Sequence, residues 1–218
     1  MSPREIGAVI RTLERQAPSW RRTAVAEVAA EQPDPFRILV ACLLSLRTQD
    51  ATTREASARL FRAADTPKAM LRLPATRIAR LIFPVGFYRT KARAIRAICR
   101  DLLTRFDGRV PDDLDTLVTL KGVGRKTANL VVTIGFAKPG ICVDIHVHRI
   151  SNRLGFVRTK MPDQTELALR AKLPRRYWIG YNDLLVAFGQ NVCRPVSPHC
   201  SRCPVVHWCR RVGVSHAR

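Results

Sequence analysis

Four cysteines near the end of the chain constrain its fold more than any other feature. They are separated by six, two and five residues: Cys193, Cys200, Cys203 and Cys209. Prolines in the connecting segments exclude a helix, so the thiols converge through irregular loops, as in a metal centre. Zinc sites usually pair their cysteines as two short clips separated by a longer gap. A cubane iron–sulfur cluster is wider than one ion and accepts uneven loops, so the spacing favours a cluster over zinc.

Disulfides are the alternative for these cysteines. The chain has seven cysteines, an odd number, and its first residues form no apolar signal region. The other three stand singly among apolar residues and are expected to be buried: Cys42, Cys99 and Cys142. We therefore expect a reducing compartment, the cytoplasm, with association to the nucleoid if the source is bacterial. No stretch is long and apolar enough to predict a membrane span.

The net charge indicates the partner. Lys and Arg number 38 against 17 acidic residues, a formal charge of +21 in 218 residues. Arg outnumbers Lys, and its planar guanidinium binds phosphate oxygens in pairs. The basic residues are spread along the chain, so the positive field belongs to the folded body. Nucleic acid is the favoured partner. A polybasic membrane contact is the weaker alternative, because no lipidation signal accompanies the charge.

Hydrophobic periodicity predicts an all-α fold, because alternating strand patterns are scarce. Apolar residues at helical spacing mark a first helix around residues 6–13, and a nearly continuous apolar run marks a buried helix over 36–46. A long helix is predicted over 91–106. Further helices are expected at 51–63, 78–83, from about 111, from 125 toward 136, from 144, at 164–173 and at 182–188.

Two glycines stand between two predicted helices, in the segment 120–128. Gly122 and Gly124 permit positive φ and close backbone approach, and the helix that begins at Arg125 offers unpaired N–H groups to a phosphate. Two close glycines alone are common in turns. The whole run Gly-Val-Gly-Arg-Lys-Thr-Ala looks like a helix-hairpin-helix element, so Gly122, Val123, Gly124 and Arg125 are expected to contact DNA.

Lys126 falls in the first turn of the second hairpin helix. Most lysines are plain surface residues, and that interpretation stays open. The positive end of a helix and the neighbouring Arg125 should both lower the pKa of the amine. A neutral amine can form a Schiff base with an aldehyde carbon, such as that of an abasic deoxyribose.

Asp144 precedes another predicted helix. From the local pattern alone, we interpret Asp144 as an ordinary N-cap of that helix. Beside a deoxyribose, its carboxylate could instead stabilise an oxocarbenium-like transition state and assist proton transfer. His146 and His148 are two residues apart and do not share a helix face, so we expect structural or DNA-facing roles and no metal.

Together, these segments resemble the endonuclease III family of base-excision DNA glycosylases. The resemblance runs from about Leu44 to Cys209. It implies a two-domain all-α fold, with a six-helix barrel over 28–138 and an iron–sulfur domain from 1–27 and 139–218. DNA would lie in the cleft between the domains. It also implies that Lys126 is the nucleophile, that Asp144 is its catalytic partner and that the four cysteines hold a 4Fe–4S cluster.

Two further segments are similar to loops that the family inserts into DNA. Arg47 stands where the family often has glutamine, and Phe87 stands where it has an apolar wedge. For Phe87 and Tyr88 the alternative is a core aromatic, which we prefer for Tyr88. Lys121 replaces the family's usual hairpin proline. The other residues expected to contact DNA are Gln49, Arg89, Lys91, His146, Arg149 and Arg194.

The resemblance implies a bifunctional enzyme that excises damaged pyrimidines, with oxidised ones as the expected class, and nicks the strand by β-elimination. The expected partner is duplex DNA with a damaged base or abasic site, bound by a monomer. One alternative is a monofunctional uracil or thymine mismatch glycosylase, whose relatives lack the lysine. Adenine-mismatch relatives lack it too and carry an extra C-terminal domain, whereas this chain ends nine residues after Cys209. The other alternative is a non-catalytic helix-hairpin-helix protein that only binds DNA.

Overall fold

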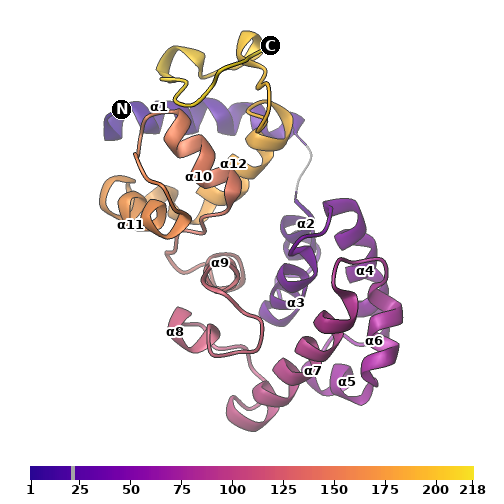
Figure 1. Ribbon diagram of the computed structural model, residues 1–218. Helices are drawn as coiled ribbons and strands as arrows, with labels where there is room; N and C mark the ends of the chain where they lie inside the picture. Colours follow the sequence, from indigo (N-terminus) through magenta and orange to yellow (C-terminus); the bar gives the residue numbers. More distant parts are fainter. Residues whose placement is uncertain (21–22) are drawn as a thin grey trace. The chain divides into compact units, whose positions relative to one another are not determined.

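The computed structural model describes residues 1–20 and 23–218, and this part of the chain contains helices and no strands. The predicted all-α class is confirmed. The chain divides into two compact units: one is Ala24–Lys138, and the other joins Met1–Thr23 to Pro139–Arg218 (Figure 1). The first boundary thus falls after Thr23, where residue 27 was expected. None of the described helices is long and apolar enough to cross a membrane.

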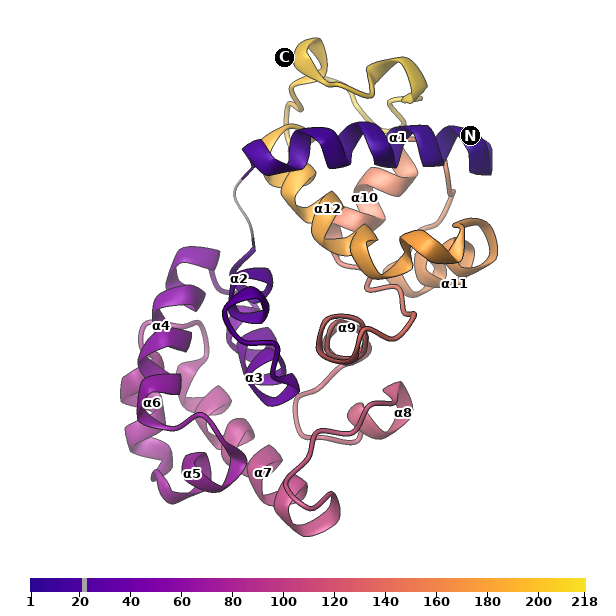
Figure 2. The same cartoon turned by 180° about the vertical axis from the view of Figure 1, so that it is seen from behind.

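The unit Ala24–Lys138 is built around one buried helix, α3 (Pro35–Ser45). Asp34 caps it by accepting a hydrogen bond from Phe36 N at 2.9 Å, and Pro35 occupies its first turn. Its side chains are apolar nearly all round, which is typical of a helix surrounded by others. Helices α2 and α4 pack on it, as Figure 2 shows.

The remaining helices of this unit are α2 (Ala24–Glu31), α4 (Asp50–Ala63), α5 (Pro67–Arg72), α6 (Ala75–Ile82), α7 (Tyr88–Arg105), α8 (Leu114–Leu117) and α9 (Arg125–Leu130). A π-helical turn, Val131–Gly135, continues α9. The sequence analysis did not predict α2 or α5. It predicted α7 from residue 91, whereas the helix begins three residues earlier, at Tyr88.

The other unit packs α1 (Pro3–Gln16) against three helices from the second half of the chain. These are α10 (Ile145–Arg153), α11 (Pro162–Lys172) and α12 (Trp178–Asn191). The apolar stripe of α1, with Ile6 and Leu13, enters the same core as Phe188 of α12. Beyond α12 the chain forms only short 3-10 turns, Cys200–Arg202 and Val206–Trp208, around the four cysteines.

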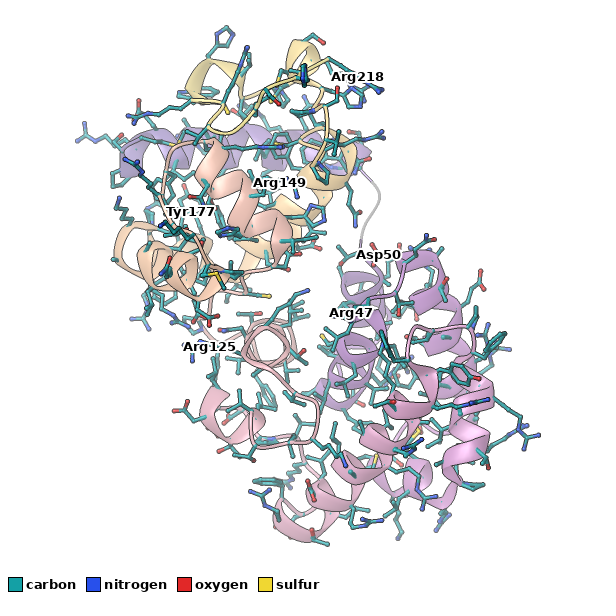
Figure 3. The ribbon with its side chains drawn as sticks, in the orientation of Figure 1. Arg47, Asp50, Arg125, Arg149, Tyr177 and Arg218 are labelled. Atoms are coloured by element: carbon teal, nitrogen blue, oxygen red, sulfur yellow. The ribbon has the colours of Figure 1, made fainter. Side chains whose placement is uncertain are left out.

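The last residue of the chain is tied to this cysteine segment. The N–H of Arg218 donates to Pro198 O, and the carbonyl of Arg218 accepts from Ser201 N, both at 2.9 Å (Figure 3). Both ends of the chain therefore help to fix one unit, whose surface carries the cysteines.

Candidate active site and cluster site

The predicted helix-hairpin-helix is present between α8 and α9. Leu120 and Val123 are buried, and Val123 N donates to Leu120 O at 3.1 Å, which closes the turn. Gly122 has φ +82°, a conformation that favours glycine. Gly124, the N-cap of α9, has φ −91°, and a Cβ there would meet nothing within 4 Å. No described neighbour therefore requires glycine at position 124, which leaves room for an outside backbone to approach.

Lys126 is the second residue of α9 and its side chain is exposed, next to the exposed Arg125 (Figure 3). The residues after it, Thr127 and Ala128, are buried. The hairpin therefore presents the Lys126 amine at the surface, at the start of a helix whose opposite face is anchored.

Asp144 is the N-cap of α10, as the structural interpretation of this residue predicted. Its Oδ1 accepts hydrogen bonds from His146 N and Val147 N, each at 2.9 Å. Both bonds go to Oδ1, and within the described residues nothing donates to Oδ2. One carboxylate oxygen can therefore cap the helix while the other meets a substrate. Lys126 belongs to the unit Ala24–Lys138 and Asp144 to the other unit.

The two expected DNA-probing residues lie together. Arg47 follows α3 and Phe87 caps α7, and the Arg47 guanidinium carbon lies 5.6 Å from the centroid of the Phe87 ring. Both residues are in the left-handed region, with φ 52° and φ 57°, which is uncommon for residues other than glycine. Phe87 is 62% exposed, so its ring is not a core aromatic. The exposure of Phe87 and its contact with Arg47 fit the expectation that both loops enter DNA.

Two expectations about the second loop are wrong. Lys91 is 8% exposed and directs its ammonium inward, so it does not face DNA. Because α7 begins at Tyr88, Lys91 lies on its buried face. Tyr88 is half-buried and outside the core: its ring packs edge-on against Phe83 at 5.4 Å and under Arg89 at 5.5 Å. Gln49 and Arg89 are exposed, as a DNA contact requires.

In the other unit, Arg149 supports the cysteine segment, whereas we expected it to face DNA (Figure 3). It donates to Cys193 O at 2.8 Å and lies 3.1 Å from Nδ1 of His146, and burial lowers its pKa. A Cβ on Gly189 would lie 2.3 Å from the same His146 nitrogen, so α10 and α12 approach each other closely at this point. Arg194 is exposed.

Sequence analysis missed Arg153, one turn after Arg149 on α10. It is 8% exposed and donates to Arg194 O and Pro195 O, both at 2.6 Å. The spacing of four residues, which places both arginines on one helix face, was the available signal. Two guanidinium groups thus hold the start of the cysteine segment.

The four cysteines line one pocket with apolar residues such as Ile150 and Val205. None of the seven cysteines is joined to another in a disulfide bond, which argues against the disulfide alternative. Arg211 N donates to the sulfur of Cys209 at 3.4 Å, and Arg153 donates to that of Cys193 at 3.6 Å. Such N–H···S contacts stabilise thiolates.

Four cysteine side chains around one pocket are the donor set that an iron–sulfur cluster requires. Burial raises the pKa of Cys203 to about 11 and also raises that of Cys209. Such half-buried thiols become thiolates when a cationic centre binds them.

Comparisons with known proteins show the family of this chain. Residues 40–175 match the family model described as HhH-GPD superfamily base excision DNA repair protein. Endonuclease III of Thermotoga maritima is 44% identical over 191 residues, which cover 86% of this chain and 90% of that protein. Endonuclease III of Bacillus subtilis is 38% identical over 186 residues, 85% of each chain.

Solved structures agree as well. A non-covalent endonuclease III–DNA complex matches with a TM-score of 0.86 and 34% identity, over 97% of this chain and 96% of that one. A trapped endonuclease III–DNA covalent intermediate, an estranged-adenine complex, matches with a TM-score of 0.77 and 37% identity, over 86% and 93%. The chain therefore belongs to the endonuclease III family of the HhH-GPD superfamily of base excision DNA repair proteins.

Proposed function

We propose that this protein is a bifunctional DNA glycosylase and abasic-site lyase of base excision repair. It excises damaged pyrimidines, oxidised ones above all, and then cuts the strand by β-elimination. The observation that carries the proposal is Lys126, an exposed amine in the first turn of α9 directly after the hairpin. A covalent endonuclease III–DNA intermediate, trapped for a protein of 37% identity, supports the same chemistry.

The hairpin binds the DNA backbone near the lesion. The N–H groups at the start of α9 and the Arg125 side chain attract a phosphate, and Gly124 lets the backbone approach closely. The damaged nucleotide must leave the base stack before its sugar can react, at a cost of roughly a few kcal/mol. Arg47 and Phe87 fill the space it leaves.

Lys126 carries the covalent steps. Its neutral amine attacks C1′, the bond from C1′ to the base nitrogen breaks, and the base leaves with a proton. Ring opening then yields a Schiff base between the lysine nitrogen and C1′. Loss of a C2′ proton breaks the bond from C3′ to its phosphate oxygen, which nicks the strand. Water hydrolyses the Schiff base and restores the lysine. The carboxylate of Asp144 stabilises the positive charge that develops on the sugar.

We also propose a 4Fe–4S cluster on Cys193, Cys200, Cys203 and Cys209. When bound, it would supply a rigid anchor for a segment that has little regular structure of its own, and the reaction at the sugar needs no step from it. Purified protein should contain about four irons per chain with acid-labile sulfide. Stoichiometric zinc without sulfide in anaerobically prepared protein would contradict the cluster.

The protein is expected to act as a monomer on duplex DNA in the cytoplasm, at the nucleoid in a bacterial cell. Two observations support this setting. The excess of 38 basic over 17 acidic residues suits an anionic polymer. None of the seven cysteines forms a disulfide bond, as expected in a reducing compartment.

Borohydride trapping tests the proposed reaction. The protein is incubated with duplexes that carry thymine glycol, uracil or an abasic site, and borohydride reduces any Schiff base to a stable adduct. We expect adducts with the thymine glycol and abasic duplexes. Lys126→Gln should form none while it still binds duplex DNA, and the matched control Lys121→Gln should trap normally. Loss of trapping in Lys121→Gln alone would show that the nucleophile is misassigned.

The same assay separates the alternatives. Release of uracil without any adduct would identify a monofunctional mismatch glycosylase. Binding of every duplex without release or adduct would identify a protein that only binds DNA.

A further inference from the structure

Lys91 is a buried ammonium group with three oxygen acceptors and no carboxylate partner in the described residues. Its Nζ donates to Leu44 O at 2.9 Å, to Leu46 O at 2.6 Å and to Thr48 Oγ1 at 3.3 Å. The two carbonyls lie at the end of α3, where a helix leaves its last carbonyls without partners. A lysine from another helix therefore caps α3 and fixes the loop that follows it.

The same network reaches the second loop. Thr48 Oγ1 also accepts a hydrogen bond from Gly86 N at 3.2 Å. A Cβ on Gly86 would lie 2.6 Å from Arg47 O, so this contact is possible only for glycine. Lys91 thus holds one loop directly and the other through Thr48, in addition to its own place in α7.

The residues between these anchors are the two expected probes of DNA. Arg47 lies between two residues that accept from Lys91, Leu46 and Thr48, and Phe87 directly follows Gly86. Arg47 and Phe87 both have left-handed backbones, which persist only where the surroundings enforce them. Backbone hydrogen bonds from Thr48 N to Ser45 O and from Tyr88 N to Val85 O span these residues, and the Lys91 ammonium adds the contacts that join the two loops.

We propose that Lys91 is a positioning residue that holds Arg47 and Phe87 as one preformed probe, so that opening the duplex at a lesion depends on a lysine that never touches DNA. The proposal rests on the proposed function, because it takes both loops as parts that enter DNA. Burial lowers the pKa of Lys91 to about 8, whereas its three oxygen acceptors favour the ammonium form.

The test compares Lys91→Met, which keeps the length of the side chain but removes its charge and donors, with Lys68→Met. Lys68 is an exposed lysine on α5 of the same unit. Fluorescence anisotropy measures the binding of an abasic-site duplex and of undamaged duplex, and borohydride trapping is measured on an abasic site in duplex and in single-stranded DNA.

The preference is the ratio of the affinity for abasic duplex to the affinity for undamaged duplex. We expect Lys91→Met to reduce this ratio about tenfold, which corresponds to the loss of at least one charged hydrogen bond. Trapping should fall on duplex and be retained on single-stranded DNA, where no opposite strand must be opened. A general loss of structure would lower both. Lys68→Met should match the wild type. A folded Lys91→Met with the wild-type preference would overturn the proposal.

Two further variants keep the proposal falsifiable. If Lys91→Met does not fold, Thr48→Val removes the hydroxyl that joins the two loops, and it should reduce the same preference. An unchanged preference would then overturn the proposal. Lys91→Met combined with Phe87→Ala should lose less of this preference than the sum of the two single losses, because Lys91 acts through the probe to which Phe87 belongs. Fully additive losses would show independent roles.

Failure of the proposed function would look different. If the wild-type protein formed no trapped adduct on any DNA, the proposed function would be overturned, and the binding preference would still report on Lys91.

Discussion

Asp144 combines a structural role with a proposed chemical one, and two substitutions separate them. Asparagine caps helices about as well as aspartate, so Asp144→Asn should keep the two hydrogen bonds to His146 N and Val147 N. It removes the negative charge on which the proposed chemical role depends. We expect single-turnover excision to fall by roughly 10²–10⁴, the usual effect of losing an acid–base group, with little change in the melting temperature.

The matched variant Asp144→Ala removes the cap as well. It should lose about 1 kcal/mol of stability in addition to activity. Normal excision by Asp144→Asn would show that the Asp144 side chain only caps α10 and has no role in the reaction.

Two of the single cysteines offer a second prediction at this scale. Burial raises the pKa of Cys42 and of Cys99 to about 12, from an ordinary value of 9.0. A raised pKa keeps the thiol protonated in the folded state, and only the thiolate reacts. Neither residue should therefore react with an alkylating reagent at pH 8 in the folded protein, and both should react after denaturation. Peptide mass mapping reads the sites, and rapid labelling of Cys42 in folded protein would contradict its burial.

Single residues also show where sequence reasoning failed. The hairpin motif around Lys126 and the spacing of the four cysteines led to predictions of their chemistry, and these remain predictions. For Lys91, a basic residue shortly after Phe87, the sequence analysis predicts a DNA contact, and this prediction is wrong. Yet Lys91 continues the apolar stripe of α7, four residues before the buried Ile95 and seven before Ile98. That register indicated burial, but no sequence pattern could reveal the carbonyls of another helix that receive the ammonium.

At the scale of elements, the hairpin glycines have different physical requirements. Gly122 has φ +82°, so Gly122→Ala should cost about 1–2 kcal/mol of stability. Gly124 has φ −91° and open space around a Cβ, so Gly124→Ala should change stability by less than about 1 kcal/mol. Its added methyl group should nevertheless weaken binding to undamaged duplex, because it occupies the space of the approaching DNA backbone.

Thermal unfolding and anisotropy on both variants test this difference. The informative result is a stable Gly124→Ala protein with reduced affinity. Unchanged affinity would mean that DNA does not approach the hairpin at this position.

The elements differ in how far the sequence could predict them. Helices α3 and α7 were predictable because each is long and strongly apolar on its buried side. Helix α5 has only six residues and was missed, although Thr66 caps it by accepting from Ala69 N. The end of α9 widens into a π-helical turn at Val131–Gly135. In this turn, a Cβ on Gly135 would lie 3.4 Å from Pro35. Such a contact between distant parts of the chain cannot be predicted from the local sequence.

At the scale of the whole molecule, the division of the chain between two units was the feature that sequence patterns could predict least. Periodicity predicted α1 but could not show that it packs with helices from the second half of the chain. The resemblance implied that arrangement, and the core shared by Ile6, Leu13 and Phe188 is its physical basis. The charge, by contrast, follows from composition alone. Even if every acidic residue paired with a basic one, 38 minus 17 leaves 21 basic side chains over.

That excess charge leads to a prediction about salt. When basic side chains neutralise Z phosphates, the logarithm of the binding constant falls linearly with the logarithm of salt concentration, with a slope of about −0.9Z for duplex DNA. We expect a steep slope for undamaged duplex, measured by anisotropy between low and physiological salt.

An abasic-site duplex should give a parallel line displaced toward tighter binding, because the probe of Arg47 and Phe87 adds contacts to bases without adding phosphate contacts. Lys91→Met should move the abasic line toward the undamaged one and leave its slope unchanged, since Lys91 is buried and neutralises no phosphate. Lines of different slope would mean that lesion recognition recruits further phosphate contacts. A flat response for both duplexes would leave the charge of +21 without the partner proposed for it.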